Sequence, residues 1–402
     1  MPPPSDMPHT PPFDYPRASV LMDEQNVEAL LVCSRANVGY LADYTYYTAQ
    51  ALPFLLEDGR EWSMSFVGLP RDPSLGAFIT PVTGEEGIIR YADPWIEDRR
   101  LWGPQWAYVG ESTASSVAPG DVAEAAATAL RDRGLGDGKI ALEFAAIPAA
   151  RYLRLRELLP HAEFVDVAPI MWALRSIKTP TEIERLRHVA EVTDAAVKCA
   201  YERLDSSCRE TDFERRLAGA LIEGGVTYGW CSIAYGPKGA TLVQPTDRVP
   251  AAGEIVRVDL VGIHNGYYSD ISRVAAFGRM PDAHAQAAHA AILEANTALQ
   301  REAGPGVRCG DLHRLTCETL EQRGFRLLAP YAGHGIGRDV HEPPFLGADD
   351  DTLLQPGMVL DFEPTMRVAG VGSVNIEDMV LITDDGCEAL TKFPRELLVF
   401  GA

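Results

Sequence analysis

The second half of the chain shows the same order of predicted elements twice, and this repeat constrains the fold more than any other feature. From residue 175 onward, two segments with helical periodicity precede strand-like segments that end near Val274. Two helical segments and a set of strands then follow again, up to Phe400. The pattern predicts one α+β domain, residues 175–402, built from two copies related by a pseudo-twofold axis, although no residue-level repeat accompanies it.

Capping and turn signals give the expected bounds of these helices. The segment 179–182 (TPTE) offers a capping threonine, a proline at the first helical position and a glutamate that closes a capping box. A second box is read at 211–214, and its helix is expected to stop at Gly224-Gly225. The second pair of helices is expected from about Asp282 to Glu302, and from near Asp311 to Gly324.

The first half alternates short strand-like and helix-like segments. This alternation predicts an α/β domain over residues 18–174, without a glycine-rich phosphate loop or a catalytic constellation. The preceding residues 1–17 are rich in proline and are expected to form a flexible arm. The strand-like runs are Val27–Cys33, Phe66–Leu69, Ala77–Thr80, Gly87–Tyr91 and Lys139–Phe144, and the helix-like runs are Val122–Arg131 and Ala149–Leu159.

Charge and cysteine content narrow the class of partner. The chain carries 57 acidic and 36 basic residues, a formal net charge of −21, so nucleic acid and anionic membranes should repel it. No apolar run reaches the ~20 residues that span a bilayer, and the N-terminus lacks the pattern of a signal peptide. The seven cysteines of the whole chain are scattered and include no C-x-x-C pair. This pattern fits a reducing cytoplasm. We expect a cytoplasmic protein that binds small molecules.

A predicted hairpin brings two aspartates together. The segment 255–273 reads IVRVDLVGIHNGYYSDISR, and its Asn265-Gly266 pair is a strong turn signal. Since side chains alternate between the faces of a strand, Asp259 and Asp270 should lie on one face as cross-strand or diagonal neighbours. Two like charges that close are unfavourable without a cation between them. In an isolated hairpin, two solvated aspartates would remain the alternative interpretation.

Two more acids and a histidine follow downstream. The apolar strands VLDFE (359–363) and VNIEDMVL (374–381) carry Glu363 and Glu377, and acids in buried strands need partners. Between the two acid pairs, His334 lies in GHGIG, where glycines leave it sterically free. A histidine alone would more often be a hydrogen-bonded core residue. Its grouping with four acids favours a metal ligand instead.

This set of side chains predicts a binuclear metal site. Four carboxylates and one imidazole suit two divalent ions, with Mn²⁺ first and Fe²⁺, Co²⁺ or Zn²⁺ as alternatives. Two such ions can hold a bridging hydroxide and polarise a substrate oxygen, which indicates addition of water to a carbonyl-like carbon. The predicted ligands are Asp259, Asp270, His334, Glu363 and Glu377, and Glu363 is also expected to act in catalysis.

These residues make the second half resemble the creatinase/prolidase/aminopeptidase P family, whose catalytic domain is the pita-bread fold. The matching stretches are VDLVGIHNGYYSDISR, GHGIGRDVHEPP, LLQPGMVLDFEP and VNIEDMVLITDDGCEALT. The resemblance implies that the five metal ligands of the family's dinuclear peptidases occupy the five positions named above, at intervals of 11, 64, 29 and 14 residues. Residues 17–44, especially NVGYLADY, resemble the family's ribonuclease-H-like N-terminal domain, which implies a homodimer.

The resemblance also suggests pocket residues and reveals two departures. His341, in VHEPP, matches a family histidine that contacts the substrate. Where the peptidases carry a histidine, seventeen residues before the first metal aspartate, this chain has Leu242. Where they commonly carry an arginine, two residues before the last glutamate, it has Asn375, which should point at the site. Both changes remove groups that stabilise a developing oxyanion, unless Gln244 or Arg367 substitutes for them.

We therefore expect a metal-dependent hydrolase that cleaves an X-Pro dipeptide or a similar small amide by attack of a metal-bridging hydroxide. The alternative, suggested by Leu242 and Asn375, is a pita-bread enzyme acting on a small non-peptide, as another C–N hydrolase or a lyase. Relatives such as creatinase and ectoine hydrolase have largely lost the metal ligands, so the intact set disfavours those two activities. A third hypothesis, a non-catalytic binding protein, is disfavoured for the same reason.

Overall fold

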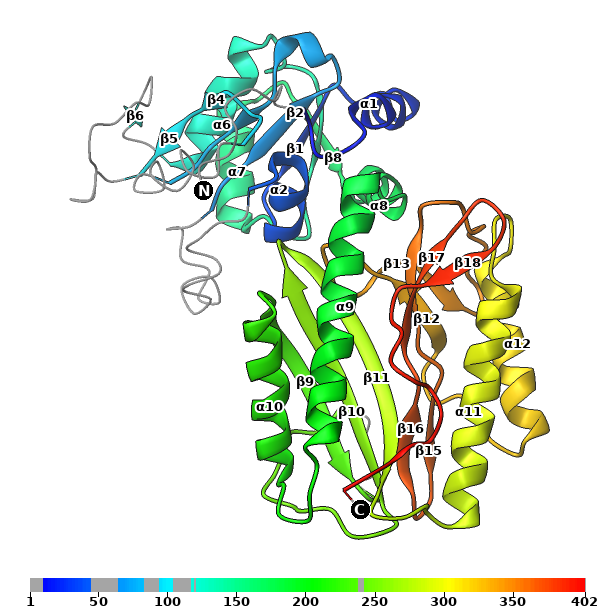
Figure 1. The fold of residues 1–402 in the computed structure, drawn as a ribbon. Helices are drawn as coiled ribbons and strands as arrows, with labels where there is room; N and C mark the ends of the chain where they lie inside the picture. The colour runs from blue at the N-terminus through cyan, green and yellow to red at the C-terminus, as the bar shows by residue number, and fades with distance from the viewer. Residues whose placement is uncertain are drawn as a thin grey trace. The chain divides into compact units, whose positions relative to one another are not determined.

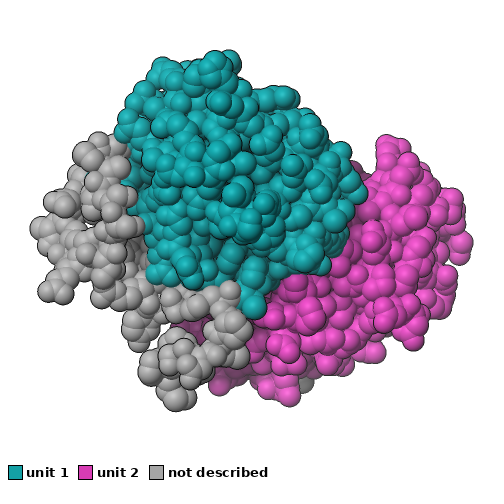
Figure 2. All heavy atoms as spheres, turned by 90° about the horizontal axis from the view of Figure 1, so that it is seen from above, with its two compact units in different colours: residues 1–174 teal, residues 175–402 magenta. Residues whose placement is uncertain are grey.

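The computed structural model describes residues 10–44, 64–82, 94–103, 117–118, 121–237 and 242–401. The chain divides into two compact units, residues 1–174 and residues 175–402 (Figure 2). The division falls within the helix α8 (Ala168–Ser176), where the sequence also indicated a domain boundary.

The first unit is built on a sheet whose central strand is β1 (Ala29–Val32). Within the described residues, the strand order is β4-β3-β2-β1-β7-β8, with β1 antiparallel to β2 and parallel to β7. Side chains of β1 enter hydrophobic clusters on both faces of the sheet, so a continuous apolar run is what this strand requires. The other strands are β2 (Val67–Pro70), β3 (Phe78–Ile79), β4 (Asp98–Arg99), β7 (Lys139–Leu142) and β8 (Glu163–Asp166), and the helices include α2 (Arg35–Ala42), α6 (Val122–Asp132) and α7 (Ala149–Leu158). The predicted strand 87–91 lies outside the described residues.

The expectation of a flexible arm over residues 1–17 is wrong for its last five residues. The helix α1 (Tyr15–Glu24) begins inside that segment, and Phe13 and Tyr15 are buried. The Tyr15 hydroxyl donates a hydrogen bond to the Pro70 carbonyl at 2.7 Å, and Arg17 donates to the Ala173 carbonyl at 2.7 Å. Burial of these two aromatic side chains in the core stabilises an ordered structure here, despite the proline-rich composition of the segment. Residues 1–9 of the segment lie outside the described residues.

The second unit confirms the predicted repeat of helix, helix and strands. The first copy consists of α9 (Pro180–Glu202), α10 (Glu210–Glu223), β9 (Thr227–Tyr235), β10 (Ile255–His264) and β11 (Tyr267–Phe277). The second begins with α11 (Ala283–Glu302) and α12 (Cys309–Gln322). Its strands are β12 (Tyr331–Gly335), β13 (Glu342–Gly347), β14 (Val359–Phe362), β15 (Thr365–Val368), β16 (Gly372–Asn375), β17 (Asp378–Ile382) and β18 (Cys387–Ala389), and β19 (Val399–Phe400) ends the chain. The helices of each copy cover the outside of a central layer of strands (Figure 1).

Among the described residues, two larger sheets and the two-stranded sheet β15-β16 form this central layer. In the described chain, one larger sheet has the order β19-β11-β10-β9 and the other β13-β12-β14-β17-β18. An isolated bridge between Ser272 and Glu377 joins strand β11 to the second copy. On β10, Val256, Val258 and Leu260 pack into the cluster under α9 and α10. The intervening residues of β10 therefore face the inner side of the layer, where the predicted ligands lie.

Two helix starts differ from the sequence prediction. The helix α10 begins at Glu210 rather than after a cap at Thr211: Arg209 is its N-cap, and the Glu210 carboxylate accepts hydrogen bonds from the amides of Tyr235 and Thr246, both at 2.9 Å. The Thr211 hydroxyl instead donates to Asp247 at 3.3 Å. The helix α12 begins at Cys309, before the predicted start. A capping box in the sequence therefore does not by itself fix the first residue of a helix.

The capping box of α9 is formed as predicted and gives a test of the fold. The Thr179 hydroxyl accepts from the Glu182 amide at 3.4 Å, and the Glu182 carboxylate accepts from the Thr179 amide at 2.9 Å. Thr179→Ala should lower the unfolding free energy by ~1 kcal/mol, which corresponds to roughly 2–4 °C in Tm for a domain of this size. Thr179→Ser keeps the hydroxyl and is the control. Equal Tm values for the two variants in calorimetry would contradict this role of the cap.

Candidate active site

The β10–β11 hairpin places Asp259 and Asp270 on the inner face as diagonal neighbours. The register pairs Asp259 with Ser272 and Asp270 with Val261. The turn residues Asn265 and Gly266 have φ values of 51° and 78°, the left-handed pair that a two-residue hairpin requires. A side-chain period of two then carries both aspartates to one face.

The second copy contributes the other acids and the histidine. Glu363 follows β14, and His334 lies on β12, in register with the end of β14. Glu377 lies between β16 and β17, so the expected single strand 374–381 is interrupted there. The Glu377 amide donates to the Ser272 carbonyl at 3.1 Å, and this contact holds Glu377 beside the strand that carries Asp270.

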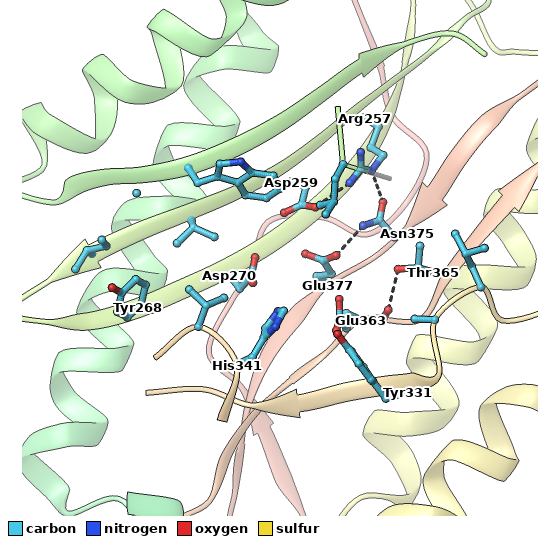
Figure 3. A pocket seen from close by; sticks show the side chains of 18 residues that line it. Arg257, Asp259, Tyr268, Asp270, Tyr331, His341, Glu363, Thr365, Asn375 and Glu377 are labelled. Carbon is cyan, nitrogen blue, oxygen red and sulfur yellow. Dashed lines mark hydrogen bonds and ion pairs between the residues drawn. The ribbon is translucent and has the colours of Figure 1, made fainter. Parts of the chain in front are cut away.

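These side chains converge on a cavity of about 580 Å³ in the second unit. Figure 3 shows the carboxylates of Asp259, Asp270, Glu363 and Glu377 facing a common space, with His341 beside them. Ligand atoms of Asp259, Asp270 and Glu377 lie within 4.8 Å of one another, and so do those of Asp270, His334 and His341. His334 is fully buried and is not among the lining residues. Since Asp270 belongs to both groups, the two groups are adjacent.

The electrostatics of the group favour bound cations. Burial raises the pKa of Asp259 to about 6 against the opposing effect of Arg257. Burial, and then the neighbouring acids, raise the pKa of Asp270 and of Glu377 well above the usual range. In the described chain, Asp270 Oδ1, His334 Nε2 and Glu363 Oε1 are buried without hydrogen-bond partners. Such atoms are costly unless an ion or a proton compensates them, so the residues present fit divalent metal ions.

His334 is held in the orientation that a ligand needs. Its Nδ1 lies 3.0 Å from the Gly335 carbonyl, which assigns the ring proton to Nδ1. Its Nε2 is then a free lone pair 3.3 Å from Glu363 Oε1. A backbone carbonyl on the far nitrogen is a common support for a metal-binding histidine.

Asn375 belongs to a buried network that the sequence analysis did not foresee. Asn375 Nδ2 donates to Glu377 Oε1 at 2.7 Å, and Asn375 Oδ1 accepts from Arg257 Nε at 2.6 Å. The same guanidinium donates to Asp259 Oδ2 at 2.8 Å (Figure 3). The positive charge missing at position 375 is therefore present, supplied from β10. Alternation along β10 could have revealed it, since Arg257 lies two residues before Asp259.

Of the other expected pocket residues, Leu242 lines the cavity with 70% of its surface exposed. Gln244 and Arg367 are exposed and are not among the lining residues. Neither takes the place of the groups that the two departures removed. Trp230 and Leu328 also line the cavity and give it, together with Leu242, an apolar portion.

His341 lines the cavity while its neighbour Glu342 holds the chain in place. The ring centroids of His341 and His334 lie 4.1 Å apart. The Glu342 carboxylate is buried and forms ion pairs with Arg175 and, at 3.6 Å, with Lys178. Burial and the neighbouring His334 lower the pKa of His341, so its ring is neutral at pH 7. A neutral imidazole at the cavity surface can donate to or accept from a substrate.

Asp361 is a second residue of the site that the prediction omitted. Its ligand atom lies within 4.8 Å of those of His334 and Glu363. It stands two residues before Glu363 in VLDFE, so the alternation applied to the other acids also indicates it.

Comparison with known proteins places this geometry in a family. A sequence model of metallopeptidase family M24 matches residues 184–384, and a model of the creatinase/prolidase N-terminal domain matches residues 90–177. The putative dipeptidase YkvY of Bacillus subtilis is 32% identical over 275 residues, which cover 67% of this chain and 76% of that protein. The Xaa-Pro dipeptidase of Pyrococcus furiosus is 31% identical over 240 residues, 59% of this chain and 69% of that protein.

Solved structures share the fold over nearly the whole chain. The X-Pro aminopeptidase of Thermotoga maritima superposes with a TM-score of 0.78 at 20% identity, covering 96% of this chain and 99% of that one. The Xaa-Pro dipeptidase of Bacillus anthracis gives a TM-score of 0.78 at 23% identity, with coverages of 96% and 99%. The fold predicted from the sequence, a creatinase-type N-terminal domain followed by a pita-bread domain, is confirmed. With its acid-rich site, its matched family model and these relatives, the chain belongs to the M24 metallopeptidases, the creatinase/prolidase/aminopeptidase P family, and is a metal-dependent hydrolase.

Proposed function

We propose that this protein is a dinuclear metal-dependent peptidase that cleaves X-Pro dipeptides or similar small amides. The observation that carries the proposal is the convergence of Asp259, Asp270, Glu363 and Glu377 on one cavity, with His334 buried beside them and, among the described residues, buried ligand atoms that lack partners. Two of the similar proteins bear the names Xaa-Pro dipeptidase and putative dipeptidase, which favours a peptide over the non-peptide alternative.

Each residue of the site has a role in this reaction. Two divalent ions bound there would lower the pKa of a shared water and polarise the scissile carbonyl. Glu363 lines the cavity, so it is placed to accept the proton of the attacking water. The Thr365 hydroxyl donates to the Glu363 carbonyl at 3.0 Å and fixes the backbone at that point. His341 faces the same space and would hold the substrate by a hydrogen bond.

The cavity also favours a small substrate with an apolar part. A volume of about 580 Å³ suits a short peptide. Trp230, Leu242 and Leu328 line it together with the acids. An apolar wall opposite a charged centre fits a proline ring or an apolar side chain next to the bond that breaks.

The remaining parts of the proposal concern metal, assembly and compartment. Oxygen-rich ligation with one histidine favours manganese over softer metals. A homodimer follows from the family resemblance alone, and analytical ultracentrifugation at micromolar concentration tests it. All seven cysteines are free thiols, which supports a reducing cytoplasm. Among the described helices, none has the length and apolarity to cross a membrane.

Metal removal is the direct test of this function. Exhaustive chelation should abolish hydrolysis of an X-Pro dipeptide, and returning Mn²⁺ should restore it. Bound metal should also raise Tm, because an ion at 100 times its Kd adds ~2.7 kcal/mol to the unfolding free energy. Asp270→Ala should lose both effects, since its carboxylate belongs to both groups of ligand atoms. Full activity in protein shown by elemental analysis to be metal-free would overturn the proposal.

The buried guanidinium gives a second prediction. Arg257→Lys keeps the charge but cannot hold Asp259 and Asn375 at the same time. Since supports of metal ligands are typically worth 10–100-fold, kcat/KM at limiting Mn²⁺ should fall by about that factor. The matched control is Arg323→Lys, on a pair with Glu294 whose side chains are 59% and 45% exposed. Equal losses in the two variants would exclude a special role for Arg257.

Substitution of Leu242 tests whether this position sets specificity. Leu242→His restores a donor beside the carbonyl and should raise kcat/KM on an X-Pro dipeptide at least tenfold, about 1.4 kcal/mol. Asn375→Arg, in contrast, should not help, because Arg257 already places a guanidinium against Asn375. A gain from Asn375→Arg without a gain from Leu242→His would reverse this assignment. Steady-state kinetics of the two single variants decide it.

A further inference from the structure

Asp361 is an acid of the inner layer that belongs to neither the predicted ligand set nor the cavity wall. It is fully buried on β14, and the register places it directly opposite His334 on β12. Because it precedes Glu363 by two residues, all three side chains extend from the same face of the sheet. Their ligand atoms lie within 4.8 Å of one another. Ligands of one ion lie at most about 4.4 Å apart, so small shifts would let all three share a cation.

In the part of the chain that the structure describes, no protein group donates to the Asp361 carboxylate, unlike that of a buried aspartate on the next strand. Within the described part of the chain, neither Asp361 oxygen has a hydrogen-bond partner. Asp378, on β17, is also buried, but its carboxylate accepts from Arg273 at 2.6 Å and from Thr391 at 2.8 Å. A structural acid in this sheet is thus supplied with donors. Asp361 needs a proton or a cation instead.

Two further observations favour the cation. A supporting role toward His334 is already filled, because Nδ1 of that ring is bonded to the Gly335 carbonyl at 3.0 Å. The charge balance points the same way. Arg257 adds one positive charge to the four predicted acids, and an ionised Asp361 restores a formal total of −4. Two divalent ions would offset that total.

We propose that Asp361 is a sixth protein ligand of the metal centre, on the ion held by His334 and Glu363. The inference rests on the proposed function, since it assumes a metal centre. A further oxygen donor on that ion favours Mn²⁺ over Zn²⁺. Because Asp361 does not line the cavity, its ligation takes no room from a substrate.

Calorimetric titration of metal-free protein with Mn²⁺ and with Zn²⁺ tests the assignment. The wild type should bind two Mn²⁺ per chain. Asp361→Asn, a neutral variant of the same shape, should keep one ion unchanged and bind the other at least tenfold more weakly. The loss for Zn²⁺ should be smaller, so the preference for Mn²⁺ falls. If the amide does not fold, Asp361→Ser repeats the test.

Controls separate the inference from the function on which it rests. Glu363→Gln should weaken the same ion, whereas Glu210→Gln, at a buried acid bonded to two backbone amides outside the cavity, should lower Tm yet keep both ions. Unchanged Mn²⁺ affinity in Asp361→Asn, beside a wild type that binds two ions, would show a protonated Asp361 and overturn the inference alone. A wild type that binds no ion would overturn the inference and the proposed function together.

Discussion

Repulsion among buried carboxylates is the interaction around which the second unit is organised. The hairpin of the first copy supplies Asp259 and Asp270, and the strands of the second supply Glu363 and Glu377. If leucines stood at these four positions, the apolar strands could bury them at little cost in free energy. With acids, burial is unfavourable until positive charge enters the space between them. Bound cations would offset this repulsion.

Two arginines show how the chain moderates this repulsion without cancelling it. Arg257 neutralises part of the charge from within, through Asp259 and Asn375. Arg273 works from the other side of β11, where it pairs with Asp378 and also donates to the Glu377 carbonyl at 2.6 Å. The Arg257 guanidinium thus holds the Asp259 carboxylate, and the Arg273 guanidinium fixes the backbone that carries Glu377. The charge that remains is the part left for metal ions.

Much of the site could be predicted because strands impose a simple rule. Alternation and one turn signal were enough to bring Asp259 to Asp270 and to direct Asn375 toward Glu377. The same rule also covers Arg257 and Asp361, but neither was predicted, because alternation gives the face of a side chain and not whether that side chain belongs to the metal site. The interruption at Glu377 depends on pairing with Ser272, a contact 105 residues distant in the chain. Local periodicity carries no signal of such a contact. Burial of Phe13 and Tyr15 depends equally on a tertiary surface that composition does not reveal.

The two-residue turn at Asn265-Gly266 has a consequence for how this family can vary. It sets the pairing of β10 with β11 to the residue, with His264 opposite Tyr267. One added residue in the turn could slip the register and carry the second half of the hairpin to the opposite face. Asp270 would then leave the group that it forms with Asp259 and Glu377. In this chain, the length of the turn is therefore constrained more strictly than most side chains along the two strands.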